Sequence, residues 1–121
     1  MLDIVFYSQA KTTVNGVEVT ENFYNWLIQS EFSQIGKTEK VEMKPDGEPV
    51  KVDAILLEGG NRRKFSNFFR DEIVQESDEV LRKLGDSPSK QEYADATFRL
   101  KNLQDLRKLV EDEKCKYLEL A

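Results

Sequence analysis

The chain has 121 residues, of which 39% are hydrophobic and 34% charged, and its net charge at pH 7 is -5. This length suits one domain of ordinary size, so we expect residues 1–121 to form a single domain. Seven Phe, four Tyr and one Trp are too much apolar mass for a disordered chain. An acidic chain repels phosphate backbones at long range, which argues against nucleic-acid binding over the whole surface.

Cysteine and histidine usage excludes several function classes. The sequence holds one cysteine, Cys115, and no histidine. One cysteine cannot form an intrachain disulfide, which excludes a secreted disulfide scaffold and is typical of cytoplasmic proteins. Histidine, the commonest general base and metal ligand, is missing. No apolar run reaches the ~20 residues that span a membrane. We therefore expect a cytoplasmic, non-enzymatic protein with no cofactor, no metal site and no membrane segment.

The first twenty residues have the pattern of strands. Residues 2–8 are apolar, β-branched and aromatic, which is typical of a buried strand. Residues 11–14 and 17–20 flank the Asn15-Gly16 pair. Both positions of a two-residue hairpin turn favour positive φ, so the pair predicts a hairpin that turns there.

A helix and a second hairpin are predicted next. Apolar residues recur at helical spacing over about 21–35, with Thr20 placed as the N-cap and Gly36 after the helix end. Residues 37–44 and 50–57 alternate on either side of a turn segment rich in proline, glycine and aspartate, which predicts two paired strands.

A second helix is predicted to begin near Arg62 or Ser66 and to run to Leu84. Gly85 would end this helix, because glycine is favoured directly after a helix C-terminus. Residues 86–88 then have turn chemistry.

The last third of the chain admits two interpretations. Residues 89–92 form a capping-box pattern, so one long helix over 90–113 is one alternative. Apolar residues alternate over 94–101, however, and on a helix Phe98 would point away from the apolar residues that follow it. We therefore favour a strand there, then a short helix and a terminal strand over 116–120. If both strands share a sheet, this order implies a right-handed parallel crossover.

Together these elements predict an α+β fold: a mixed, mostly antiparallel sheet with two or three helices packed on it.

A run of cations follows the glycine pair at 59–60. Four cations and no acid lie between Arg62 and Arg70. At a helix start these cations would lie at the positive end of the helix dipole, which is unfavourable by about a few tenths of a kcal/mol each. A bound phosphate or carboxylate would make the same arrangement favourable. Alternatively, the cations are solvated or are neutralised by acids such as those at 111–113. The predicted ligand-binding residues are Asn61, Arg62, Arg63, Lys64 and Arg70.

Five acids and no cation occupy the next stretch, residues 71–79. They form either a solvated helix face, partly paired with cations one turn further on, or a face that binds a partner. Phe23, Tyr24 and Trp26 on the first helix cannot all face one core, so an aromatic there is a candidate interface anchor, unless the helix buries a wide stripe. The predicted partner-binding residues are Trp26, Tyr24, Asp71, Glu72, Glu76, Asp78 and Glu79.

The main functional expectation is a small acidic protein-binding module, such as an inhibitor, an immunity protein or a phage-type accessory protein. An acidic surface attracts and can block a basic partner. One alternative is a binder of a phosphate-bearing small ligand or nucleotide at residues 59–70. The other is a homo-oligomeric structural or assembly protein that uses exposed aromatics and strand edges.

Overall fold

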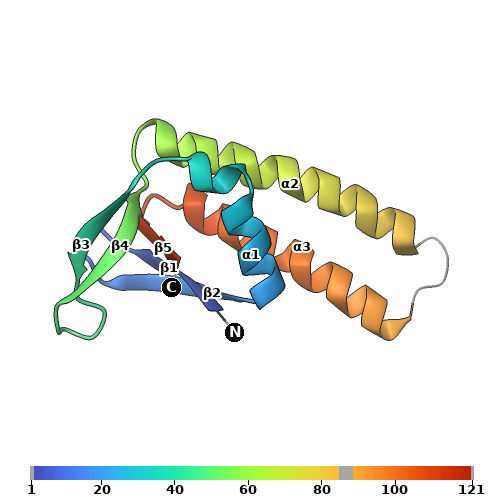
Figure 1. Cartoon of the computed structure of the whole chain (residues 1–121), viewed down its shortest axis with the longest axis horizontal. Coiled ribbons are helices and arrows are strands. Elements are labelled where there is room, and N and C mark those ends of the chain that lie inside the picture. Colours follow the sequence, from blue (N-terminus) through green and yellow to red (C-terminus); the bar gives the residue numbers. More distant parts are fainter. Residues whose placement is uncertain (1, 85–88, 121) are drawn as a thin grey trace.

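An antiparallel sheet and a long helical hairpin make up residues 2–84 and 89–120, the part of the chain that the computed structural model describes (Figure 1). In chain order the elements are β1 (Leu2–Tyr7), β2 (Thr13–Val19), α1 (Glu21–Gln29), the 3-10 helix η1 (Glu31–Gln34), β3 (Thr38–Met43), β4 (Val50–Leu56), α2 (Gly60–Leu84), α3 (Lys90–Glu111) and β5 (Tyr117–Leu120).

The strands form one sheet in the order β2-β1-β5-β4-β3, so the terminal strand lies in the middle. Each neighbouring pair is antiparallel. The α+β prediction is confirmed. The predicted parallel crossover is wrong, because β5 runs antiparallel to both of its neighbours.

The predicted turn at Asn15-Gly16 is also wrong. The chain reverses earlier, where the Ser8 N–H donates to the Thr12 carbonyl at 2.8 Å and Lys11 takes the positive φ of 68°. Strand β2 then continues straight through Asn15 and Gly16. Pairing with β1 along this strand outweighs the local turn preference of the Asn-Gly pair.

The predicted first helix is divided into two. Thr20 is the N-cap as predicted, and its Oγ1 accepts a hydrogen bond from the Phe23 N–H at 3.1 Å. Helix α1 ends at Gln29, because Ser30 takes an extended conformation and its hydroxyl donates to the Leu27 carbonyl at 2.6 Å. The 3-10 helix η1 follows and covers the rest of the predicted range.

Helix α3 runs without a break, so the predicted strand over 94–101 is wrong and the long-helix alternative is confirmed. Ser89 caps it, with Oγ accepting from the Glu92 N–H at 3.1 Å. Phe98 does point away from the buried stripe that contains Leu103, and 39% of it is exposed. The capping signal was therefore the better guide than the alternation.

The main core lies between the sheet and the three helices. Its buried members from the sheet include Ile4, Phe6 and Leu118, and those from the helices include Phe65 and Leu106. A smaller cluster of Tyr7, Met43 and Ala54 lies on the opposite face. The end of β3 reaches the β1–β2 turn, where the Lys44 N–H donates to the Lys11 carbonyl at 2.8 Å, so the sheet curls over this second cluster.

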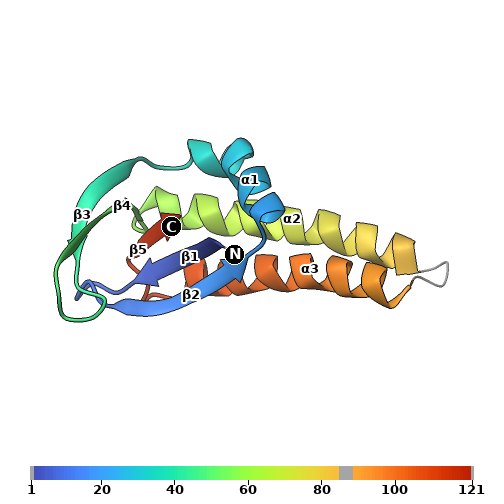
Figure 2. The ribbon, with the colours of Figure 1, turned by 60° about the horizontal axis from the view of Figure 1, so that its bottom comes forward.

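Helices α2 and α3 lie side by side, and their far ends extend beyond the sheet (Figures 1 and 2). Val80 is buried in this part of the hairpin, whereas Val74, Leu81 and Tyr93 are exposed. The predicted helix end at Gly85 and the turn at 86–88 lie outside the described residues. Within the described ranges, no helix is long and apolar enough to cross a membrane.

Candidate functional site: an acidic groove between η1 and α2

A hollow of about 840 Å³ lies where η1 and its flanking residues face α2. Ser30, Glu31 and Ile35 line one side, and Lys64 and Phe68 are among the residues that line the other. Ile35 and Phe68 also pack against the main core, so they form an apolar base for the groove. At Ser30 the chain leaves α1 and begins η1, and both Ser30 and Glu31 line this hollow.

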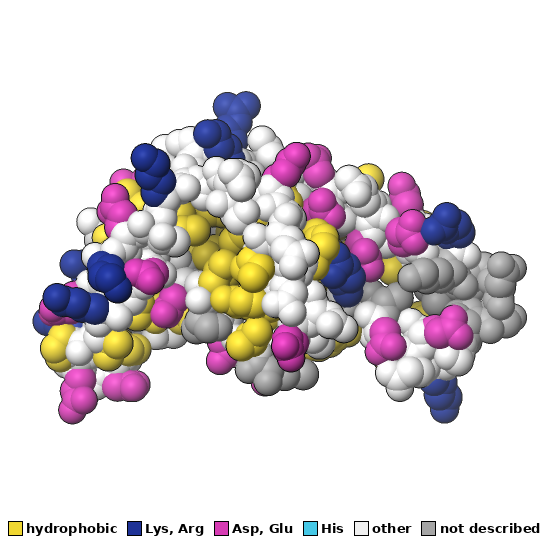
Figure 3. All heavy atoms as spheres, viewed as in Figure 1, with side chains coloured by type: hydrophobic (Ala, Val, Ile, Leu, Met, Phe, Trp, Pro, Cys, Tyr) yellow, Lys and Arg dark blue, Asp and Glu magenta, His cyan; other side chains and the backbone are white. Residues whose placement is uncertain are grey.

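Carboxylates from two elements gather at this groove. Glu31 on η1 and both Asp71 and Glu72 on α2 line it, and Figure 3 shows acidic side chains gathered where α1 and η1 meet α2. Burial raises the pKa of Glu72, and the negative charges of Asp71, Glu76 and Glu31 raise it further. Arg99 acts in the opposite sense without cancelling the shift. The groove therefore holds like charges close together.

The five acids of residues 71–79 differ in what surrounds them, and partner binding by the whole run stays a prediction. Asp71 and Glu72 line the groove, as described. Glu76 accepts a hydrogen bond from Nε of Arg99 at 3.1 Å, and Glu79 accepts one from Arg82 at 2.7 Å. Asp78 is exposed on the projecting part of α2. Two of the five predicted acids thus lie in the groove, and two others are paired with cations.

The aromatics predicted to bind a partner connect elements of the fold. The Trp26 ring centroid lies 5.5 Å from that of Phe23 and 6.0 Å from that of Phe68 on α2. The guanidinium of Arg99 stacks over Trp26 at 4.2 Å. The Tyr24 hydroxyl donates to a β5 carbonyl at 3.5 Å. Both aromatics are partly buried and join α1 to other elements, and Trp26 contacts Phe68, which lines the groove.

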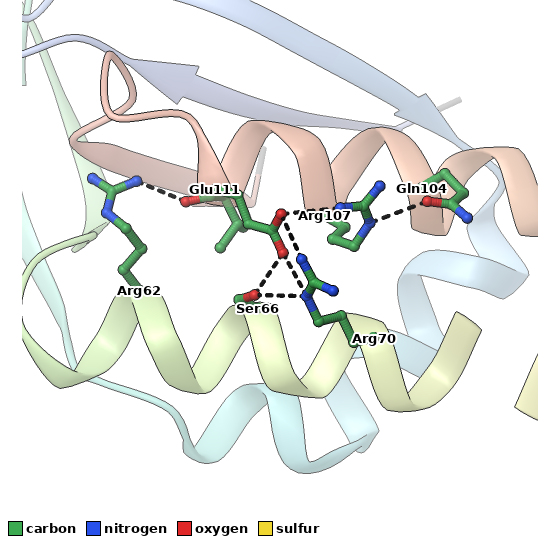
Figure 4. A network of polar contacts seen from close by, with 7 residues as sticks. Arg62, Ser66, Arg70, Gln104, Arg107 and Glu111 are labelled. Carbon is green, nitrogen blue, oxygen red and sulfur yellow. Dashed lines mark hydrogen bonds and ion pairs between the residues drawn. The ribbon is translucent and has the colours of Figure 1, made fainter. Parts of the chain in front are cut away.

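The predicted anion-binding segment begins α2, and Arg62 is turned toward the end of α3 (Figure 4). Its Nη1 donates to the carbonyls of Val110 at 2.6 Å and Asp112 at 2.9 Å, and its Nη2 donates to the Cys115 carbonyl at 2.6 Å. The last carbonyls of a helix lack partners within the helix, and a cation there is favoured by the helix dipole. Arg62 therefore caps α3.

The other members of that segment point in different directions. Arg70 pairs with Glu111 at 2.8 Å, and Ser66 donates to the same carboxylate at 2.6 Å (Figure 4). The Asn61 amide donates to a backbone carbonyl of β4 at 3.1 Å. Arg63 and Lys64 are exposed, and Lys64 lines the acidic groove. These five residues do not surround a common pocket, and anion binding there stays a prediction.

Sequence reasoning missed the contribution of Ser30 and Glu31 to the groove. A signal was available, because a serine followed by an acid is the pattern of a new helix start. Ser30 does cap η1, accepting from the Phe32 N–H at 3.3 Å. Because one helix was expected over 21–35, a second helix start at Ser30 was not considered.

Metal and thiol chemistry have little support in the described ranges. No three Asp, Glu or Cys side chains there are close enough to hold a metal ion. Cys115 is fully buried, and burial raises the pKa of its thiol to about 11, which keeps it protonated. No protein-family model, curated protein or solved structure matches the chain.

Proposed function

We propose that this protein is a non-enzymatic binding module whose acidic groove receives a cationic segment of another protein. The observation that carries the proposal is the gathering of Glu31, Asp71 and Glu72 around one hollow, with the pKa of Glu72 raised. A lysine or arginine placed there would find carboxylates on both sides of the groove, and its long apolar stem would pack on Phe68 and Ile35.

The electrostatics of the whole chain support the same class of partner. The net charge of -5 attracts a basic protein at long range and speeds the encounter. The groove then supplies a defined place for one or two basic side chains. This arrangement suits an inhibitor or an immunity protein that covers a basic site on its target.

A selection experiment tests the proposal. A phage-displayed library of random ten-residue peptides is selected on the intact protein, and the bound peptides are sequenced. Peptides rich in Lys and Arg are expected, with an affinity that falls as salt rises. The double variant Asp71→Asn, Glu72→Gln should bind them about tenfold more weakly, because two charge-assisted hydrogen bonds are weakened.

The matched control is Asp46→Asn, Glu48→Gln, which removes the same charge from the exposed β3–β4 connection. It should bind the selected peptides within about twofold of the unaltered protein, the change expected from long-range attraction alone. Equal weakening by both double variants would show that net charge acts without the groove. Selected peptides without basic residues would also refute the proposal.

A further inference from the structure

One face of the sheet has no helix of the described residues packed on it. The main core, to which α1, η1, α2 and α3 all contribute, lies on the face of Ile4 and Leu118. The cluster on the other face consists of strand residues alone. Helices α2 and α3 lie together behind strands β1 and β2 in Figure 2. We call the face without helices the open face.

The strand register identifies the residues of the open face, because directly opposite residues share a face. Tyr7 of β1 lies opposite Tyr117 of β5, and Tyr117 lies opposite Leu56 of β4. Alternation along each strand gives the other members. The apolar residues of the open face are Val5, Tyr7, Val41, Met43, Val50, Val52, Ala54, Leu56 and Tyr117.

Much of this apolar surface is in contact with water. Tyr7, Met43 and Ala54 are buried where the sheet curls, but Leu56 is 39% exposed and Val50 is 48% exposed. The other apolar residues of the open face are partly buried. The solvent side of an antiparallel sheet is usually polar. A connected apolar surface there is typical of a site that binds another protein.

Every charged residue that the described strands place on the open face is an acid. The four are Asp3, Glu18, Glu39 and Glu119. The two strand cations, Lys40 and Lys51, lie on the other face, where Lys40 pairs with Asp53 at 3.5 Å. The open face therefore combines an apolar surface with negative charge alone.

Glu119 lies among the apolar residues of the open face. It is opposite Val5, and its Oε1 accepts a hydrogen bond from the Tyr7 hydroxyl at 2.7 Å. This is its only side-chain hydrogen bond among the described residues, and an ionised carboxylate accepts several. A lysine or arginine has an apolar stem and a cationic end, so it suits both Glu119 and the surface around it.

A second copy of the chain does not fit this charge pattern. Two open faces packed together would bring the same four carboxylates against each other, and like charges across an interface are unfavourable. A partner with apolar and basic side chains matches the pattern instead. Packing a helix on a sheet is one way to bury an apolar sheet face.

The dimensions of the open face suit a short helix. The strands from β1 to β3 follow the order β1-β5-β4-β3, so three strand spacings of about 4.8 Å give a width of about 14 Å. A helix of about 12 residues is about 18 Å long and crosses this width.

We infer that the open face of the sheet binds an amphipathic helix of a partner protein, with apolar side chains on Val52 and Leu56 and Lys or Arg side chains at Glu39 and Glu119. The apolar stripe of such a helix packs into the curl of the sheet, and its basic flanks meet the carboxylates. This surface is separate from the acidic groove, so the inference does not rest on the proposed function.

The test uses a phage-displayed library of 18-residue helical peptides, selected on the intact protein. Leucine is fixed at every third or fourth position, and the remaining positions are random. We expect Lys and Arg to be enriched at the random positions. Failure to select any peptide, or selection without basic enrichment, would overturn the inference.

Nuclear magnetic resonance then locates the strongest peptide on the isotope-labelled protein. The amide signals of β1, β4 and β5 should shift, and those of η1 and of residues 64–75 should not. Shifts confined to η1 and residues 64–75 would place the peptide in the acidic groove and refute the inference. The groove variant Asp71→Asn, Glu72→Gln should keep the affinity within about twofold, so the two proposals succeed or fail separately.

Glu39→Gln and Glu42→Gln form a matched pair, because both residues are exposed on β3 and they lie on opposite faces. Glu39→Gln should weaken peptide binding about threefold, as expected for the loss of one exposed ion pair. Glu42→Gln removes the same charge from the other face and should change the affinity by less than about 1.5-fold. Equal weakening by both variants would show that net charge acts without the open face.

Val52→Thr tests the apolar contact, because threonine keeps the β-branched shape and adds a hydroxyl. The peptide should bind about fivefold more weakly, since this hydroxyl loses water without gaining a partner. Val74→Thr, on the exposed part of α2, is the control and should leave the affinity unchanged. Light scattering should show a monomer at high concentration. A dimer that Val52→Thr dissociates would overturn the inference, because the occupant would then be a second copy.

Discussion

Replacing Arg62 by methionine should destabilise the protein strongly, although nothing in the local sequence marks this arginine as structural. Methionine keeps most of the apolar stem but removes three hydrogen bonds, to one carbonyl in the last turn of α3 and two in the residues that follow it. Hydrogen bonds to a charged group contribute about 1.5–3 kcal/mol each. One guanidinium makes all three, and Arg62 is only half-buried, so water can replace part of the loss. We therefore expect the free energy of unfolding to fall by about 3 kcal/mol.

Urea denaturation measures this change. With a slope of about 2 kcal/mol/M, the midpoint should fall by about 1.5 M. The neighbouring Arg63 is exposed, so Arg63→Met should change the free energy of unfolding by less than about 0.5 kcal/mol. Arg62→Lys keeps the charge, but an ammonium lacks the planar fork that reaches three carbonyls. Its urea midpoint should lie between those of Arg62→Met and Arg63→Met. Equal midpoints for Arg62→Met and Arg63→Met would refute the capping role.

Three further predictions concern ionisable groups. The hydrogen bond from Arg70 holds the pKa of Glu111 below its usual value. The ionised Glu111 therefore stabilises the fold at any pH above the pKa that this carboxyl has in the unfolded chain. This stabilisation is lost as the pH falls through the lower pKa of the folded protein. Glu111→Gln should therefore cost about 1 kcal/mol at pH 7, and urea titrations at several pH values should show the difference shrink on acidification. The Cys115 thiol should react with a thiol reagent at pH 8 only after denaturant is added, because it is buried and its pKa is raised to about 11; fast reaction of the native protein would contradict this. Burial raises the pKa of Tyr7, as does its 2.7 Å hydrogen bond to Glu119, so stability should be lost as the pH rises above about 10, the ordinary value for tyrosine. Thermal melts of Tyr7→Phe should show a weaker loss in that range.

Local signals predicted much of the fold because they are satisfied locally. Thr20 and Ser89 cap their helices through hydrogen bonds that reach only three residues along the chain. The strands over 2–8 and 50–57 were predicted from their own apolar patterns, and both lie in the sheet as β1 and β4. In each case the physical cause and the sequence pattern occupy the same few residues.

The errors arose where distant parts of the chain decide the outcome. The acceptors of Arg62 lie about fifty residues away, at and just beyond the end of α3, so the local sequence could not show that this cation has internal partners. The Asn15-Gly16 pair has turn chemistry, yet pairing with β1 keeps it in a strand. Alternation over 94–101 mimicked a strand because Phe98 faces a hollow and does not face the core. Composition cannot reveal these arrangements.

Trp26 connects α1 to both of the long helices. Helix α1 ends where Ser30 turns the chain, and its Trp26 ring lies against Phe68 of α2 and under the guanidinium of Arg99 of α3. Phe68 lines the acidic groove, and Arg99 lines a separate hollow near the start of α1. Arg99 also opposes the rise in the pKa of Glu72 at the groove without cancelling it. Trp26, which the sequence predicts to bind a partner, therefore joins two residues that line different hollows.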